Sequence, residues 1–296
     1  MQVTNELNAL LSLIDDPDSE VYESVSGKLM GYGRPIIPDL ENLWENQPDE
    51  KVQERIQFII RRLQIREIGV DLKEWKKAGC ADLLEGALLV AKYDQPDLCL
   101  DSLRNEVELL KKNIWLELNN FLTPLEQAKV MKNMVYEFFD LKGTQLMNTQ
   151  VNDFFLHHVI QKKQGNTLTN GLLYHLLCQQ LNIKTSLLFF PNTYMLAFYS
   201  TGLLYEPKYP PVRESIQFYV EPATGQPYTQ HDVDIYFKRS KLEPTVNYFT
   251  PLSHENIIVR LLLETAKCYQ EKNNDPIKAA ELTSLADQIK LYNPDT

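Results

Sequence analysis

The sequence lacks any apolar run long enough to cross a bilayer. Its longest apolar stretches, such as GALLVA and TSLLFF, fall far short of the roughly 20 residues that a membrane-spanning helix needs. The opening residues have no basic residue ahead of their apolar stretch and acidic residues directly after it, which is unlike a secretory signal. We therefore expect a cytoplasmic protein without a membrane partner.

Closely spaced cysteines are also missing. The four cysteines, Cys80, Cys99, Cys178 and Cys268, form no CxxC pair of the kind that binds metals or acts in redox chemistry. We expect them to be reduced and mostly buried thiols. The sequence thus predicts neither a cofactor nor a metal site.

Basic residues are too few for a nucleic-acid partner. The chain holds 30 Lys and Arg against 40 Asp and Glu, a net charge of -10, and its first fifty residues carry eleven acids against Lys28 and Arg34 alone. Such a surface repels phosphate. The basic cluster Arg55, Arg61, Arg62 and Arg66 is flanked by acids, and we interpret it as a solvated helix face.

The composition and length are typical of a globular protein of about two domains. Of the 296 residues, 44% are hydrophobic and 24% are charged. Apolar residues at helical spacing predict helical hairpins over residues 1–66, and the turn DDPDSEV resembles that of a HEAT repeat. Residues 67–164 continue as helices. Among them, Thr123, Pro124 and Glu126 form the pattern of a capping box at a helix start.

Residues 165–235 change character. The run LTNGLLYHLLCQQLNI predicts a buried helix. KTSLLFF and TYMLAFYS predict strands, and RESIQFYVEPATGQPYT predicts a strand that runs into a turn. Residues 236–296 predict a helical hairpin that resembles one tetratricopeptide-like unit. The fold class is therefore α+β and predominantly helical, with a small antiparallel sheet flanked by helical hairpins. The loop with Pro207, Pro210 and Pro211 is either a partner-facing lid or a rigid surface connection.

The runs GNTLTNGLLYHLLCQQLNI, LLFFPNTYMLAFY and FYVEPATGQPYT resemble the Sir-B-type branch of the transglutaminase-like superfamily. The likeness covers roughly residues 70 to 250 and implies a transglutaminase- or papain-like core over residues 67–235. Related bacterial proteins combine this core with an N-terminal HEAT-like segment and a helical C-terminus, and this chain looks similar over its whole length.

In active members of the superfamily, a Cys-His-Asp triad carries out acyl transfer. Matched to the family pattern, the cysteine position is Thr167, the histidine position is Thr193 and the acid position is Glu221 before Pro222. An internal threonine without a base is a poor nucleophile. The resemblance therefore implies a catalytically inactive protein that serves as an interaction or regulatory scaffold, with a protein or peptide partner.

Two other hypotheses stay open at this point. The first is a cysteine-independent hydrolase or acyltransferase that uses Thr167 or Thr169 with Glu221. The second is that the motif-like features only hold the fold, since paired aromatic residues in strands are more often core residues than ligand platforms. An open pocket shared by Thr167, Thr193 and Glu221 would favour an enzyme.

Binding residues of the former cleft are expected at four positions: Asn152, Asp153, Asn166 and Tyr194. Asn152 and Asp153 also fit a helix-capping role, and Asn166 could cap the buried helix. Gly165 is expected to supply backbone freedom for the turn into that helix.

The remaining chemically active side chains have structural interpretations. We expect Cys178 to lie in the core and His175 to face away from the apolar stripe of its helix, with a surface or capping role. His157 and His158 are adjacent on a helix and point about 100° apart, so we expect them not to bind a metal together. His231 and His254 stand at expected helix starts, where local hydrogen bonds explain them.

Overall fold

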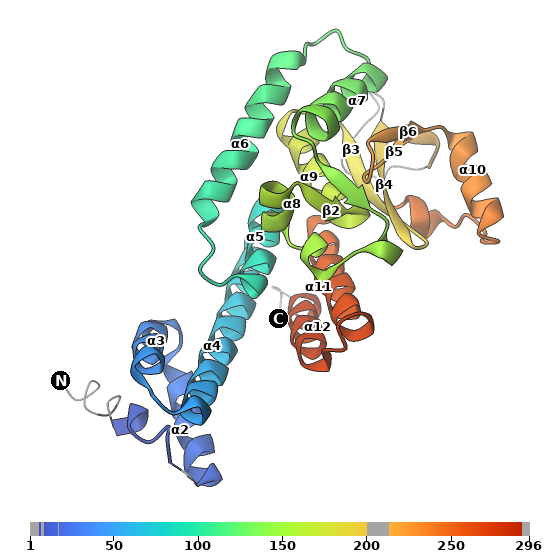
Figure 1. Cartoon of the computed structure of the whole chain (residues 1–296). Helices are drawn as coiled ribbons and strands as arrows, with labels where there is room; N and C mark the ends of the chain where they lie inside the picture. Colours follow the sequence, from blue (N-terminus) through green and yellow to red (C-terminus); the bar gives the residue numbers. More distant parts are fainter. Residues whose placement is uncertain (1–5, 7–8, 17, 200–212, 292–296) are drawn as a thin grey trace. The chain divides into compact units, whose positions relative to one another are not determined.

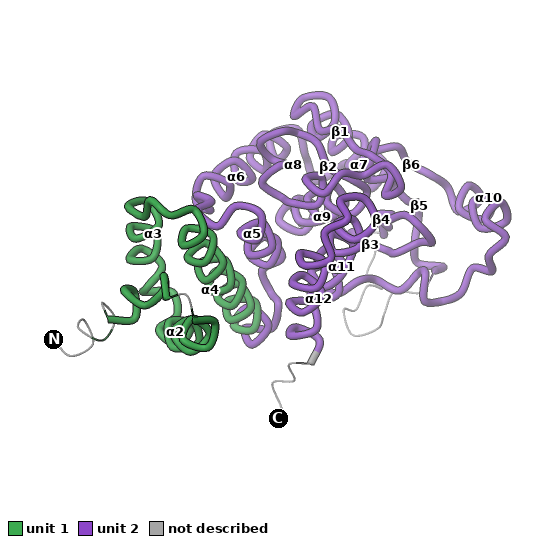
Figure 2. Tube along the Cα trace, turned by 60° about the horizontal axis from the view of Figure 1, so that its bottom comes forward, with its two compact units in different colours: residues 1–74 green, residues 75–296 purple. Residues whose placement is uncertain are grey.

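A computed structural model describes residues 6, 9–16, 18–199 and 213–291, and it divides into two compact units, residues 1–74 and 75–296 (Figure 2). Helices predominate, and the strands form one four-stranded antiparallel sheet and one short parallel pair. The expected fold class is confirmed. The loop with Pro207, Pro210 and Pro211 lies outside the described residues.

The first unit is built from helices with clear start and stop signals. The Asp18 carboxylate accepts a hydrogen bond from the Glu20 amide at the start of the first of them, and Gly33 ends that helix with a φ of 70°. The helical elements are α2 (Ser19–Tyr32), the 3₁₀ turn η1 (Arg34–Ile36), α3 (Ile37–Asn46) and α4 (Glu50–Lys77).

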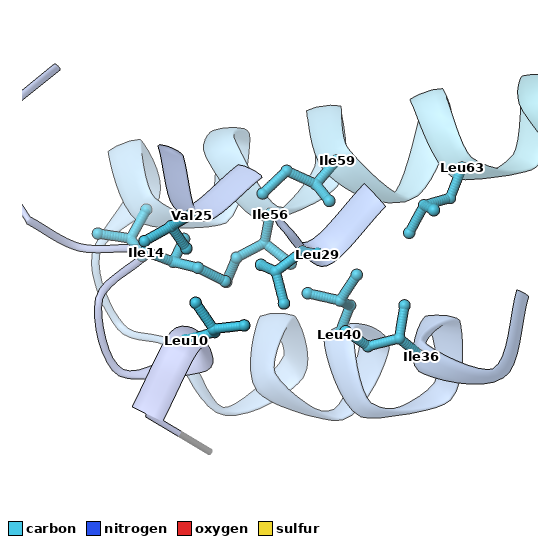
Figure 3. Close-up of a cluster of buried hydrophobic side chains, with 10 residues drawn as sticks. Leu10, Ile14, Val25, Leu29, Ile36, Leu40, Ile56, Ile59 and Leu63 are labelled. Atoms are coloured by element: carbon cyan, nitrogen blue, oxygen red, sulfur yellow. The ribbon is translucent and has the colours of Figure 1, made fainter. Parts of the chain in front are cut away.

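Aliphatic side chains from these helices form the core of the first unit (Figure 3). Figure 3 shows Leu29, Leu40 and Ile56 pointing toward one another from three different helices, and all three are fully buried. The other members of this cluster are Leu10, Ile14, Val25, Ile36, Val52, Ile59 and Leu63. The helical spacing of apolar residues in the sequence therefore marks the buried faces.

Arg55 departs from the expected solvated helix face. Its guanidinium donates to the carbonyl oxygens of Ile14 and Asp16, at 3.2 and 2.7 Å, and lies 4.8 Å from the centre of the Tyr22 ring. The half-buried Arg55 thus ties the segment before α2 to α4, because carbonyls left free at a helix end need donors.

The expected boundary between residues 66 and 67 falls inside a continuous helix. α4 runs from Glu50 to Lys77, and the first compact unit ends at Glu74. The residues around position 66, LQIREIG, contain no proline and only one glycine, so nothing in them interrupts the helix.

The second unit contains most of the helices (Figure 1). None of the helices in the described part of the chain is both long and apolar enough to span a membrane. The elements are α5 (Leu83–Asp94), α6 (Leu100–Glu117), α7 (Pro124–Lys132), the π-helical turn η2 (Asn133–Phe138), α8 (Leu156–Lys162), α9 (Thr167–Gln180), α10 (Gln230–Arg239), α11 (His254–Glu271) and α12 (Pro276–Leu291). The expected capping box at Thr123 is confirmed, because its hydroxyl and the Glu126 carboxylate each accept from the other residue's amide.

The antiparallel sheet has the strand order β3-β4-β5-β6. Its strands are β3 (Thr185–Phe190), β4 (Thr193–Tyr199), β5 (Ile216–Glu221) and β6 (Gln226–Tyr228). Each strand pairs with the next along the chain, as the sequence runs and the turn ATGQ indicate.

The two faces of this sheet carry different helices. On one face, the Tyr174 ring of α9 contacts Phe198 edge-on with centroids 6.3 Å apart, and Gly171 of α9 lies against Leu187. On the other face, Val233 and Phe237 of α10 pack with the strand side chains that point away from α9. These are Leu188, Phe190, Met195, Ala197, Tyr199, Ile216 and Tyr219. The sheet therefore lies between α9 and α10, with both faces covered (Figure 1).

A second, parallel pair of strands is absent from the sequence prediction. β1 (Lys142–Thr144) pairs with β2 (Gln164–Asn166), which leads directly into α9. Four short 3₁₀ turns complete the described elements: η3 (Leu146–Asn148), η4 (Val151–Phe154), η5 (Arg213–Ser215) and η6 (Val246–Phe249).

Candidate functional site

The buried helix α9 begins at Thr167, the position where active relatives would carry the nucleophile. Asn166 precedes it as the N-cap, and its side-chain oxygen accepts from the amides of Leu168 and Thr169 at 2.8 and 3.0 Å. Thr167 itself is fully buried, and its hydroxyl has no hydrogen-bond partner. Asn166, also fully buried, is thus a capping residue rather than a ligand of an open cleft.

Asp153, which precedes α9 in the chain, is hydrogen-bonded to the first residues of this helix. Its carbonyl oxygen accepts from the Thr169 hydroxyl at 2.7 Å and from the Asn166 amide group at 3.3 Å. Its carboxylate accepts from the Gln150 amide at 2.8 Å and from the Gln164 side chain at 3.2 Å. Asp153 thus completes a capping box at η4 and does not cap the helix α8, where the sequence led us to expect it.

Asn152 and Asp153 neighbour each other but face different surroundings. Asn152 is exposed on η4, whereas Asp153 is buried. The N-cap residue of the following helix α8 is Phe155, without a side-chain cap. Only Asp153 of this pair therefore belongs to the network that holds the start of α9.

Gly165 is required for a reason other than the expected one. Its φ is not positive, so backbone freedom does not explain the glycine. A Cβ atom at this position would lie 2.3 Å from the Asn170 side-chain oxygen and 2.8 Å from the Thr169 hydroxyl. Close approach of α9 leaves room only for a hydrogen atom.

Thr193 and Glu221, the expected histidine and acid positions, line one cavity of about 400 Å³. The Glu221 carboxylate accepts from the Gln145 side chain at 2.6 Å and from the Thr224 hydroxyl at 2.8 Å. Gln145, which sequence reasoning did not single out, also lines the cavity. The remaining lining residues are Met147, Phe190, Asn192, Met195, Tyr228, Asp232, Val233 and Tyr236.

The structure does not bring Thr167 into this cavity. Thr193 lies two residues before Met195 on β4, and Glu221 two residues after Tyr219 on β5. Alternation therefore points both toward the α10 face of the sheet, where the cavity lies. α9 packs on the opposite face, and Thr167 at its start is not among the residues that line the cavity.

Tyr194, like Phe198, is turned toward the α9 face by alternation along β4. It is fully buried, its ring lies 5.2 Å from that of Phe189, and its hydroxyl has no hydrogen-bond partner within 3.5 Å. Burial raises its pKa, and the charge of Glu264 on α11 adds to this while that of Arg260 opposes it. Tyr194 is therefore a neutral core residue without access to a ligand.

His175 and Cys178 of α9 are both buried. The expectation of a surface role for His175 is wrong, because its ring is only 4% exposed and contacts the Thr185 hydroxyl at 3.0 Å. Burial lowers the pKa of His175 to about 3 and raises that of the Cys178 thiol. Cys178 is a core residue, as expected, and neither group is suited to proton transfer or nucleophilic attack near neutral pH.

A second cluster of chemically active groups lies on other elements. Asp94 ends α5, and His157 and His158 stand in the first turn of α8; none of the three lines the cavity. Both Nε2 atoms lie close to one carboxylate oxygen, at 3.1 Å for His157 and 3.2 Å for His158. Local spacing in the sequence carries no signal for this meeting, because Asp94 is more than sixty residues away.

These ionisable groups change one another's pKa values. The His157 and His158 rings lower the pKa of Asp94 against the opposing effect of burial. The pKa of His158 is also lowered, by burial first and then by the charge of His157, against the attraction of Asp94.

Comparison with known proteins agrees with this architecture. The model of the transglutaminase-like superfamily matches residues 101–263, more than half of the chain and all within the second unit. No curated protein and no solved structure gives a significant match. With its buried helix α9 followed by an antiparallel sheet, the chain belongs to the transglutaminase-like superfamily.

Proposed function

We propose that this transglutaminase-like protein is a non-catalytic interaction or regulatory protein. One observation carries the proposal: Thr167 is buried with an unpartnered hydroxyl and is not among the residues that line the cavity of Thr193 and Glu221. Nucleophilic catalysis needs a nucleophile within hydrogen-bond reach of its base. Among the described residues, those that line the cavity include no cysteine, histidine or lysine.

The alternative, a cysteine-independent hydrolase or acyltransferase, draws less support. Thr167 has no partner for its hydroxyl and no base beside it, and the Thr169 hydroxyl is engaged with Asp153 and Asn166. Neither threonine therefore has the activating hydrogen bond that such an enzyme requires.

We extend the proposal to the finer family assignment and the cell compartment. The chain fits the Sir-B-type branch, with HEAT-like hairpins before its core and a tetratricopeptide-like hairpin formed by α11 and α12, in the cytoplasm of a bacterium. The assignment of the last hairpin is supported by two consecutive helices, α11 and α12, that are joined by the short segment 272–275.

The ligand that the cavity favours is a peptide segment of a protein partner. Phe190, Met195 and Val233 give it an apolar wall. Glu221 and Asp232 add two carboxylates, and no Lys or Arg in the described part of the chain lines it. Apolar walls with a few placed polar groups are typical of ligand sites. A peptide with an apolar side chain next to a basic one would match this lining.

Blocking the cavity tests the proposal. A Thr193→Arg variant fills the cavity with a long cationic side chain, and Glu221→Gln removes one carboxylate. Full-length protein is used to capture partner proteins from its native cell extract. The affinity of the protein for peptides from these partners is then measured by calorimetry. Both variants are expected to weaken binding by at least about 10-fold, which is about 1.4 kcal/mol.

Asn105→Arg, a change at an exposed position of α6, is the matched control and should bind like the wild type. Partners that bind the two cavity variants and the control equally would contradict a role for this cavity.

A further inference from the structure

Asp94, His157 and His158 bring three metal-ligating atoms together in the second unit. One nitrogen of each histidine and one oxygen of Asp94 all lie within 4.8 Å of one another. The His157 and His158 rings stand 4.2 Å apart, tilted by 41°. Adjacent helix positions diverge at Cβ, but here both rings approach the carboxylate at the end of α5, so divergence at Cβ does not keep the two nitrogens apart.

We propose that Asp94, His157 and His158 form a binding site for a divalent transition-metal ion of the zinc class. This site is independent of the cavity and of the proposed function.

The observed spacing fits zinc coordination. Ligand atoms bound to a tetrahedral zinc at about 2.0–2.1 Å lie about 3.3 Å from each other. The distances from the Asp94 Oδ2 atom to the two Nε2 atoms are 3.1 and 3.2 Å. These two distances therefore need to change little when a zinc ion binds. Two imidazoles with one carboxylate favour zinc, nickel or copper over calcium or magnesium, which take oxygen ligands.

The site has an open side for a fourth ligand. The Asp94 and His158 side chains are 26% and 21% exposed, whereas His157 is 2% exposed. Water can therefore complete the coordination from the exposed side. Asp94 comes from the carbonyl end of α5, whose partial negative charge favours a cation, whereas both histidines come from the first turn of α8.

The surroundings of His157 limit the affinity. A histidine that binds metal through Nε2 carries its proton on Nδ1, and the Nδ1 atom of His157 is buried without a hydrogen-bond partner. Loss of such an outer partner lowers metal affinity by about 10- to 100-fold. We expect micromolar rather than nanomolar binding, as suits a site that responds to metal availability.

Metal binding would join α5 to α8. α8 leads through β2 into the start of α9, so the ion would fix the helical part of the second unit next to the buried helix. An ion that binds only the folded chain raises its melting temperature as the metal concentration rises.

Calorimetric titration of full-length, chelator-treated protein with Zn²⁺ tests the site. The expected result is one zinc per chain, with competition from Co²⁺ but none from Mg²⁺ or Ca²⁺. Asp94→Asn and His158→Gln, changes on two different helices, should each weaken binding by more than about 100-fold. Circular dichroism without metal checks that both variants fold.

His231→Gln and Cys99→Ser serve as controls, because both positions are exposed and belong to no cluster in the described part of the chain. Both should keep wild-type binding, and the bound Co²⁺ should lack the absorption of a thiolate ligand. Absence of binding up to about 1 mM Zn²⁺, or binding unchanged in both Asp94→Asn and His158→Gln, would overturn the proposal.

Discussion

At the scale of single residues, two threonines in the first turn of α9 have opposite surroundings. The Thr167 hydroxyl is buried without a partner, whereas the Thr169 hydroxyl donates to the Asp153 carbonyl and accepts from the Asn166 amide. A buried polar group without a hydrogen-bond partner destabilises the folded protein, whereas a hydrogen-bonded one stabilises it. The two positions should therefore respond oppositely to the same substitution.

Replacing each threonine with the isosteric valine measures this difference. Thr167→Val is expected to raise the free energy of unfolding by about 1 kcal/mol, because it removes an unpaired hydroxyl. Thr169→Val is expected to lower it by about 1–3 kcal/mol, because the Asn166 amide loses its acceptor. Urea unfolding of both variants checks the prediction, and destabilisation by Thr167→Val would show that its hydroxyl has a partner in solution.

His175 predicts a pH dependence of stability. Burial, with a smaller contribution from the charge of His254, lowers its pKa to about 3, against about 6.5 in an unfolded chain. Between these values the unfolded chain binds a proton that the folded chain does not. The unfolding free energy should therefore fall as the pH decreases below about 6.5, by up to about 1.4 kcal/mol per pH unit.

A His175→Asn variant should show a shallower decline than the wild type in urea unfolding between about pH 7 and about pH 5. His231→Asn, at an exposed position, should follow the wild-type curve. Parallel curves for His175→Asn and the wild type would mean that His175 is protonated in the folded protein.

Only part of the site is predictable from the sequence. Alternation along TYMLAFY places Thr193 and Tyr194 on opposite faces of their strand, and the amino-acid pattern alone indicates this. The pattern does not indicate which face receives α9, because that depends on packing between segments far apart in the sequence. The same limit hides Gln145 beside Glu221, and Asp94 beside the two histidines.

At the scale of elements, the parallel pair β1–β2 positions the start of α9. Gly143 of β1 lies against the turn after β5, where a Cβ atom would come within 2.4 Å of the Ala223 backbone. The Tyr136 hydroxyl holds the same turn by donating to the Pro222 carbonyl at 2.7 Å. The strand pair and the turn thus meet at a contact that only glycine permits.

A Gly143→Ala substitution is expected to lower the free energy of unfolding by about 1–3 kcal/mol, because backbone atoms cannot yield as side chains do. Gly27→Ala in α2 is the control. A Cβ atom there meets nothing within 4 Å, so the better helix propensity of alanine should raise stability by up to about 1 kcal/mol. Thermal and urea unfolding compare the two, and equal stability of Gly143→Ala and the wild type would contradict the close contact.

Elements with strong local signals are predicted well. The capping box at Thr123 and the strands β3, β4 and β5 are where the sequence places them, whereas the sequence predicts the short strand β6 only as part of a turn. β1 and β2 are missed because each has only three residues and their pairing is non-local. The boundary at residue 66 rests on composition, while α4 continues without a helix-breaking residue.

At the scale of the whole molecule, the family match ends at residue 263, inside α11. The first unit and α12 lie outside the matched region. In the function proposed above, these helical additions would serve recognition. The net charge of -10 makes a basic partner more favourable than a nucleic acid.

The proposed lack of a nucleophile-base pair at Thr167, Thr193 and Glu221 is the central claim, and a turnover assay tests it most directly. Purified full-length protein is incubated with acyl donors, amine acceptors and peptide substrates, and products are followed by mass spectrometry. The wild type, Thr167→Ala and Glu221→Gln should all give no product above a control without protein. Turnover by the wild type that disappears in Thr167→Ala or Glu221→Gln would contradict the claim.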